Sequence, residues 1–128
     1  MPSPAPVVHF EIGCQNIEKA RRFFGEVFGW EYAPNVVPNN AAMVGNLGPF
    51  AASPTAGIGG HLNSLGHPPH QYVTVYIQVD DIEQALAKIE RASGSTLIPK
   101  QEVPGMGWFA WFKDPEGNVL GLWKTMKM

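Results

Sequence analysis

The segment WFAWFKDPEGNVLGLW, residues 108–123, decides the predicted fold, because two apolar runs flank five turn-forming residues. Pro115 fixes a backbone dihedral suited to a turn, and Gly117 tolerates a positive φ, so residues 114–118 are predicted to connect a β-hairpin. With a five-residue loop, Trp111 lies opposite Gly121 and Phe109 lies opposite Trp123. Directly opposed residues share one face of the sheet, so this register assigns every hairpin side chain to a face.

The two predicted faces of the hairpin differ in character. One is uniformly aliphatic and aromatic, and we expect it to pack under a helix; it consists of Ala110, Phe112, Leu120 and Leu122. The other is rich in tryptophan and consists of Phe109, Trp111, Gly121 and Trp123. A loop of a different length would exchange the faces of one strand. The tryptophan-rich face is the candidate for a role beyond packing.

Composition limits the class of protein. A chain of 128 residues forms one domain and needs no disulfide to fold, and the single Cys14 cannot pair within the chain. A net charge of -2, with nine scattered Lys and Arg, argues against a nucleic-acid surface. No apolar run is long enough to span a membrane, and residues 1–6 do not resemble a signal peptide. We therefore expect a cytoplasmic protein with neither a nucleic-acid nor a membrane partner.

The first half of the chain predicts a strand followed by a helix. Residues 7–14 alternate, with Phe10 and Ile12 on one face and His9 and Glu11 on the other. Asn16 is a predicted N-cap, and Gly29 ends the helix. Its apolar stripe comprises Ile17, Ala20, Phe23, Phe24, Val27 and Phe28. Further strands are predicted from residue 30 and, more weakly, over 41–46 and 57–62, before a linker at 63–70.

The same pattern returns 65 residues later. Six identities occur in the 26 positions from His9 to Pro34, and strand parity, helix cap, helix stripe and terminal glycine recur at one offset. Asp81 is the second N-cap and Gly94 the second terminal glycine. Residues 96–99 are a predicted strand, followed by the hairpin. Each copy is therefore predicted to be βαβββ, which makes an α+β chain of two tandem modules.

The chain resembles the vicinal oxygen chelate superfamily, which contains glyoxalase I, extradiol dioxygenases and the bleomycin resistance proteins. The resemblance covers residues 7–123 and rests on four segments in order: His9-Phe-Glu-Ile12, Phe23-Phe-Gly-Glu-Val-Phe-Gly-Trp30, Val79-Asp-Asp-Ile82 and Asp114-Pro-Glu-Gly-Asn118. Three further segments are similar to a glyoxalase-like bacterial branch: Phe28-Gly-Trp30, Pro104-Gly-Met-Gly107 and Leu120-Gly-Leu-Trp123.

The resemblance implies two βαβββ modules whose curled mixed sheets surround a central cavity. On this basis we expect a disordered tail at 1–6 and a single domain at 7–128, with modules at 7–62 and 71–128 joined by the linker. It also implies sheets that close within one chain or pair with a second chain, so we expect a homodimer. Phe28, Trp30 and Tyr32 cannot all point into one core, which is consistent with an interface.

The superfamily's metal enzymes take ligands from matched strands of both modules and a Glu from the last strand. His9 occupies the first of these positions, but the resemblance places Thr74 and Gly121 at the other two. One imidazole cannot supply the roughly three ligands of a metal site, so we predict no metal and no cofactor. A rearranged site that uses His61 and Glu11 stays open as an alternative, and His67 and His70 are predicted to be exposed loop residues.

Strand parity nevertheless predicts a lined cavity. Its candidate ligand-binding residues are His9, Glu11, His61, Thr74, Tyr76, Phe109 and Trp111. They predict binding of a small, partly aromatic or carbonyl-bearing molecule. Two alternatives stay open. The first is a lyase, isomerase or dioxygenase that uses a rearranged metal site or a His9/Glu11 acid-base pair. The second is simple packing, in which the ring of Trp111 lies over Gly121 and fills the space.

Overall fold

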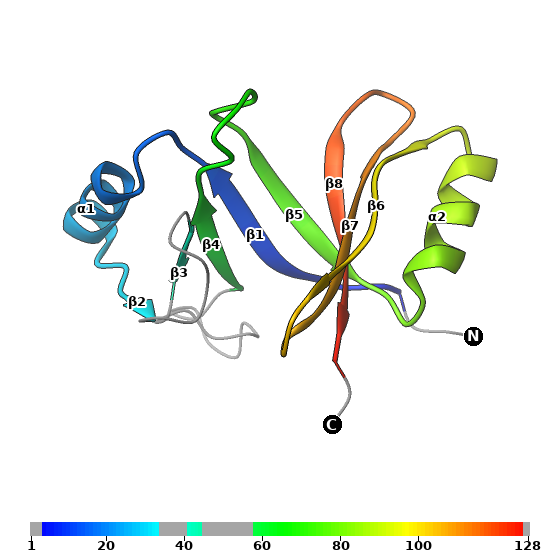
Figure 1. The fold of residues 1–128 in the computed structure, drawn as a ribbon, viewed down its shortest axis with the longest axis horizontal. Coiled ribbons are helices and arrows are strands. Elements are labelled where there is room, and N and C mark those ends of the chain that lie inside the picture. The colour runs from blue at the N-terminus through cyan, green and yellow to red at the C-terminus, as the bar shows by residue number, and fades with distance from the viewer. Residues whose placement is uncertain (1–3, 34–40, 45–57, 127–128) are drawn as a thin grey trace. The chain divides into compact units, whose positions relative to one another are not determined.

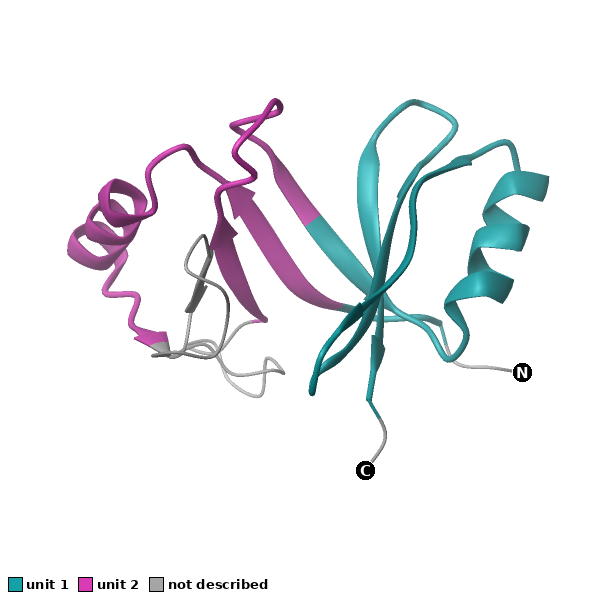
Figure 2. Cartoon of the chain, in the orientation of Figure 1, with its two compact units in different colours: residues 1–7, 75–128 teal, residues 8–74 magenta. Residues whose placement is uncertain are grey.

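A computed structural model describes residues 4–33, 41–44 and 58–126 (Figure 1). The chain divides into two compact units, of which unit 2 comprises residues 8–74 and unit 1 comprises residues 1–7 and 75–128 (Figure 2). The element order is βαβββ twice, which confirms the predicted α+β fold of two tandem modules. Neither helix in the described ranges has the length and apolar character needed to cross a membrane.

Unit 2 contains one helix and four neighbouring strands of an eight-stranded sheet. Its elements are β1 (Val7–Gly13), α1 (Ile17–Phe28), β2 (Tyr32–Ala33), β3 (Ala41–Val44) and β4 (Gly59–Asn63), with the strand order β2-β3-β4-β1. Strands β1 and β4 are parallel, with Glu11 opposite His61 and Gly13 opposite Asn63. The predicted strand at 57–62 thus continues to Asn63, and its position 57 lies outside the described residues, as do positions 45 and 46 of the strand predicted at 41–46.

Local signals set the ends and the orientation of α1. The Asn16 side chain accepts a hydrogen bond from Lys19 N at 2.9 Å, and Gly29 ends the helix at φ 73°, both as predicted. The Trp30 ring stacks on Phe24 of α1, with ring centroids 4.8 Å apart, and lies 5.4 Å from the ring of Phe10. Phe10 therefore faces the helix, and alternation places His9 and Glu11 on the opposite face of β1.

The apolar stripe of α1 is only partly covered. No residue of this helix is buried, and Phe23, Val27 and Phe28 are each more than half exposed. The aromatic residues of the stripe instead contact one another: the rings of Phe24 and Phe28 stack, and Phe23 meets both edge-on. Periodicity correctly identified the helix, but the stripe is wider than the surface that the sheet covers.

Unit 1 contains the hairpin and a cluster of buried apolar side chains. Strand β5 (Val73–Gln78) leads into α2 (Ile82–Arg91), β6 (Ser95–Val103), β7 (Gly107–Lys113) and β8 (Val119–Thr125), and the strand order is β5-β8-β7-β6. The hairpin register is the predicted one, with Trp111 opposite Gly121 and Phe109 opposite Trp123. Helix α2 runs beside these strands (Figure 1). It buries Ile82 and Leu86 against Ala110, Phe112 and Leu122, which confirms the predicted core face.

Two features of unit 1 differ in extent from the sequence prediction. Helix α2 ends at Arg91, before the predicted terminal glycine Gly94, and the left-handed residue that follows the helix is Ser93, at φ 76°. Gly94 is instead needed for close approach, because a Cβ there would lie 2.7 Å from the carbonyl oxygen of Lys113. The strand predicted over 96–99 also continues to Val103. Strand β6 is the edge strand, and its register shifts on both sides of Ile98, so Pro99 and its missing N–H are tolerated there.

Candidate functional site

A buried carboxylate lies at the centre of a polar cluster in unit 2. The Glu11 side chain is 2% exposed and accepts hydrogen bonds from the Tyr72 hydroxyl and, at 3.2 Å, from Asn63 Nδ2. His61 Nε2 lies 3.2 Å from the other carboxylate oxygen. A buried carboxylate needs hydrogen-bond donors and charged partners of this kind to offset its loss of solvation. The side chain is therefore held in one position from three directions.

The cluster continues from His61 to His9. His9 Nε2 lies 2.7 Å from His61 Nδ1, and the two ring centroids are 4.9 Å apart. Close polar contacts thus run from His9 through both ring nitrogens of His61 to the Glu11 carboxylate, the first a hydrogen bond and the second an ion-pair contact. We call His9, Glu11, His61, Asn63 and Tyr72 the Glu11 cluster.

The histidine chain accommodates two protonation states. When His61 is neutral, its Nε2–H donates to Glu11, so its Nδ1 accepts from His9 Nε2–H. When His61 is protonated, both of its N–H groups donate, and His9 Nε2 becomes the acceptor with the His9 proton on Nδ1. Neither state breaks a bond of the chain.

Burial tunes two of the titratable groups. It lowers the pKa of His9 from 6.5 to about 4, an effect that the neighbouring His61 reinforces and Glu11 partly offsets. Burial, and then the hydrogen bond to Glu11, raise the pKa of the Tyr72 hydroxyl well above its usual range. At neutral pH His9 is consequently an uncharged imidazole and Tyr72 is a hydrogen-bond donor.

The backbone positions Tyr72 by means of a glycine. Gly13 N donates to the Tyr72 carbonyl at 2.8 Å, and any Cβ at position 13 would overlap the Tyr72 ring. The ring thus lies over Gly13, from which the hydroxyl reaches Glu11. Asn63 lies opposite Gly13 in the parallel pairing of β1 with β4. Close approach at Gly13 therefore brings Tyr72 and Asn63 to the same carboxylate.

The structure brings three of the predicted site residues together and adds two. His9, Glu11 and His61 meet in unit 2, whereas Asn63 and Tyr72 were not among the predicted residues. A signal for both was present in the sequence: Tyr72 shares the strand parity of Thr74 and Tyr76, and Asn63 follows His61 by two positions. The omission came from assigning Asn63 to the linker.

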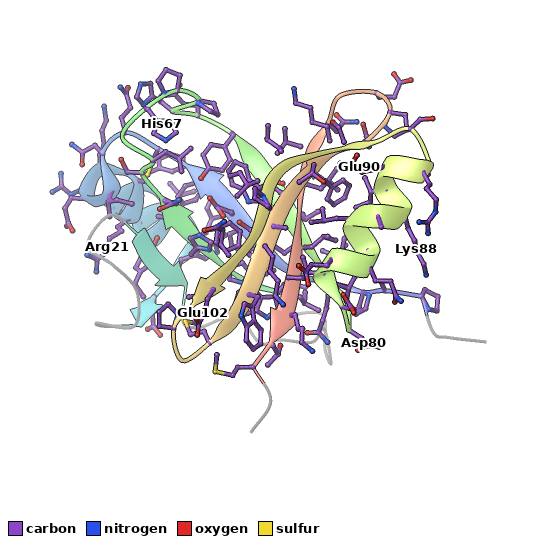
Figure 3. All side chains as sticks on the ribbon, turned by 45° about the vertical axis from the view of Figure 1, so that its right-hand side comes forward. Arg21, His67, Asp80, Lys88, Glu90 and Glu102 are labelled. Carbon is purple, nitrogen blue, oxygen red and sulfur yellow. The ribbon has the colours of Figure 1, made fainter. Side chains whose placement is uncertain are left out.

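Of the other predicted site residues, all but Thr74 belong to unit 1. Thr74 is buried at the start of β5. In unit 1, Trp111 Nε1 donates to the Tyr76 hydroxyl at 2.8 Å, and these side chains are 7% and 6% exposed. Phe109 is half-buried on β7. His67 lies exposed in the loop between β4 and β5 (Figure 3).

The residues present do not fit the metal site of the resembled superfamily. Tyr76 is paired with Gly121 across β5 and β8, and its ring, rather than that of Trp111, lies over this glycine. A carboxylate side chain at position 121 would collide with that ring. Among residues 4–33, 41–44 and 58–126, no three His, Cys, Asp or Glu side chains converge as metal ligands.

Two curated relatives match most of the chain in sequence. At 28% identity, 83% of the chain aligns with 40% of the putative glyoxylase CFP32 of Mycobacterium tuberculosis. At 24% identity, 95% of it aligns with 48% of the anthracycline biosynthesis protein DnrV of Streptomyces peucetius. The chain thus spans less than half the length of these curated relatives.

A solved structure is similar over nearly the whole chain. It is a variant of the Streptomyces coelicolor methylmalonyl-CoA epimerase in complex with 2-nitronate-propionyl-CoA, with a TM-score of 0.71. The match covers 98% of this chain and 100% of the epimerase at 15% identity, and shows a shared fold. The sequence profile of the Glyoxalase/Bleomycin resistance protein/Dioxygenase superfamily matches residues 7–122. The chain therefore belongs to this superfamily.

Proposed function

We propose that the protein binds a small carbonyl-bearing molecule at the Glu11 cluster. The observation that carries this proposal is the continuous chain from His9 through His61 to the buried Glu11 carboxylate. A buried polar cluster of this kind costs stability unless it is fully bonded, and a structural role alone requires no titratable pair of histidines. The side chain of His61 is 18% exposed, so solvent reaches the middle of the row of contacts from His9 to Glu11.

The cluster offers both kinds of partner that an oxygen-bearing ligand requires. An imidazole N–H donates to a carbonyl oxygen, and an imidazole nitrogen without a proton accepts from a hydroxyl group. The fixed carboxylate holds His61 in one orientation, and His61 in turn holds His9. Because the rings are already positioned, a ligand would lose little affinity in ordering them.

Calorimetric titration with small ketones and hydroxyketones tests this proposal. The wild type should bind at least one of them, and His61→Ala should abolish binding while a thermal melt shows a folded protein. His67→Ala is the matched control, because His67 is an exposed loop histidine outside the cluster. Equal affinities of the two variants for every bound compound would place the ligand elsewhere.

A second candidate function is proton transfer to and from the bound molecule, and the two protonation states of the chain favour it. A proton leaves the carbon next to the carbonyl for His9, and the C–H electron pair stays on the substrate as an enolate. The Nε2 proton of His9 passes to His61, so the positive charge lies beside Glu11. Return of the proton to either face of that carbon or to its neighbour would make the protein an epimerase or isomerase.

Isotope exchange separates binding from catalysis. In D₂O, a catalytic protein would incorporate deuterium at the carbon next to the carbonyl of a bound ketone, as followed by proton NMR. Glu11→Gln should slow this exchange more than it weakens binding, because the proton on His61 loses its counter-charge. Binding without exchange above the rate in buffer would rule out proton transfer and leave the binding proposal standing.

A further inference from the structure

Unit 2 has a pocket beside α1 that shares no lining residue with the Glu11 cluster. Its volume is about 320 Å³, at the lower end of the range for small-molecule sites. One wall is made by residues of the helix, namely Glu18, Arg21, Arg22, Gly25 and Glu26. The other wall is made by Trp30 and Tyr32, which follow the helix in the sequence.

Contacts with α1 hold the aromatic wall in position. The Trp30 ring stacks on Phe24, with ring centroids 4.8 Å apart, and the Tyr32 hydroxyl donates to the Arg21 carbonyl at 3.3 Å. The Arg21 guanidinium lies 5.2 Å from the centroid of the Tyr32 ring and pairs with Glu18 at 2.8 Å. Trp30 and Tyr32 are both partly exposed. The two rings are therefore ordered in advance and available for contact with a ligand.

The helix wall contains a glycine that the helix itself does not require. Gly25 lies within α1, where glycine costs roughly 0.5–1 kcal/mol relative to alanine. Among the described residues, the nearest atom to a Cβ at this position is the Trp30 carbonyl oxygen, at 3.5 Å, which is an ordinary van der Waals distance. Neither close packing nor an unusual backbone conformation explains the glycine. Its missing side chain instead leaves space in the wall of the pocket.

Arg22 and Glu26 place opposite charges at the pocket. They are exposed and lie about 6 Å apart along the helix axis, since four residues separate them. They form no ion pair with each other, and neither has an ion-pair partner elsewhere in the part of the chain that the structure describes. Arg21 and Glu18, in contrast, pair with one another. The pocket thus offers one cation and one anion beside two aromatic rings.

We propose that this pocket binds an aromatic α-amino acid. The carboxylate of the amino acid pairs with the Arg22 guanidinium, and its ammonium group pairs with the Glu26 carboxylate. Its ring contacts Trp30 and Tyr32 in the space beside Gly25. An α-amino acid carries both charges on one carbon, so a single small molecule matches both side chains. The proposal is independent of carbonyl binding at the Glu11 cluster, and either can fail without the other.

Calorimetric titration with L-phenylalanine and L-tryptophan tests this proposal. Three analogues of phenylalanine each lack one feature: phenethylamine lacks the carboxylate, 3-phenylpropionate lacks the ammonium group, and L-alanine lacks the ring. The wild type should bind phenylalanine at least about tenfold more tightly than each analogue, because each loses one of the three contacts. Binding of neither aromatic amino acid, or equal affinities for phenylalanine and any analogue, would overturn the proposal.

Charge variants test the assigned pairs one at a time. Arg22→Gln should bind phenylalanine and phenethylamine equally, because nothing pairs with the carboxylate in this variant. Glu26→Gln should bind phenylalanine and 3-phenylpropionate equally, for the corresponding reason. Lys19→Gln is the matched control, since Lys19 is exposed on the same helix and does not line the pocket. If Lys19→Gln weakens phenylalanine binding as much as the other two variants do, the charge of the helix and not the pocket is responsible.

A steric variant tests the location. Gly25→Leu fills the space in the pocket wall and should abolish phenylalanine binding, while leucine favours the helix more than glycine does. Circular dichroism and a thermal melt should therefore show a folded protein. Unchanged phenylalanine binding by folded Gly25→Leu would place the ligand elsewhere and overturn the proposal. If Gly25→Leu does not fold, the Arg22 and Glu26 variants decide, because both side chains are exposed.

Discussion

Removal of the Tyr72 hydroxyl is expected to destabilise the protein measurably. Tyr72→Phe keeps the ring over Gly13 but deletes the donor to a carboxylate that is 2% exposed. Hydrogen bonds to charged groups contribute about 1.5–3 kcal/mol, and a buried charge that loses a donor is at the upper end. Asn63 and His61 still contact the carboxylate, so it is not left bare. We expect a loss of about 2 kcal/mol in the free energy of unfolding.

The assay is equilibrium unfolding in urea, and the same chain supplies a matched control. The Tyr32 hydroxyl donates to the Arg21 carbonyl at 3.3 Å, a bond between neutral groups. Tyr32→Phe should therefore cost only about 0.5–1 kcal/mol. Unchanged m-values would show that both variants unfold from the same state. Equal losses in the two variants would refute the reasoning that Tyr72 holds the buried Glu11 carboxylate.

Four further predictions concern pH, packing, metal content and assembly. The pKa of His9 is about 4 in the folded state and 6.5 ordinarily, so the stabilisation from neutral His9 is fully present above pH 6.5 and is lost as the pH falls toward 4, by at most about 3 kcal/mol. In urea unfolding, the free energy of unfolding should depend less on pH for His9→Gln than for the wild type. Trp111→Ala removes a buried ring and should lower the free energy of unfolding by about 3–5 kcal/mol, as followed by a thermal melt, and Trp111→Phe should lower it much less. If the melt of Trp111→Ala is unchanged but ligand binding is lost, Trp111 is a site residue. Elemental analysis should find well below one equivalent of zinc, nickel, manganese or iron per chain, and one full equivalent would refute the ligand argument from Thr74 and Gly121. Sedimentation should give a homodimer at micromolar concentration that Phe28→Glu dissociates, because Phe28 is 62% exposed; a monomeric wild type would contradict this.

Elements specified by neighbouring residues were predicted well from the sequence. The Asp114 carboxylate accepts from the backbone N–H groups of Glu116 and Asn118, and Gly117 adopts φ 94°, so the turn itself sets the hairpin register. The caps at Asn16 and Asp81 are likewise local. Alternation along β1 then placed Phe10 toward the helix. Each of these predictions required only residues close together in the sequence.

The composition of the site depended on pairings that no local signal specifies. Strands β1 and β4 are parallel and about 50 positions apart, so no turn fixes the register that sets Asn63 opposite Gly13. Gly121 likewise has a neighbour on a strand that is distant in the sequence. Strand β8 lies between β5 and β7, so the neighbours of Gly121 are Tyr76 on one side and Trp111 on the other. The hairpin register specifies only the partner on β7, whereas the ring over the glycine comes from Tyr76 on β5.

Binding of a carbonyl compound at the histidine pair of the Glu11 cluster is tested most directly by NMR of the histidine rings. The chain has four histidines, and His67 and His70 lie outside the cluster as internal references. Titration of ring-labelled protein with methyl phenylglyoxylate or hydroxyacetone should shift the ring resonances of His9 and His61 saturably and leave the other two unchanged. If either compound binds saturably while the His9 and His61 resonances stay unchanged, the ligand does not bind at the Glu11 cluster.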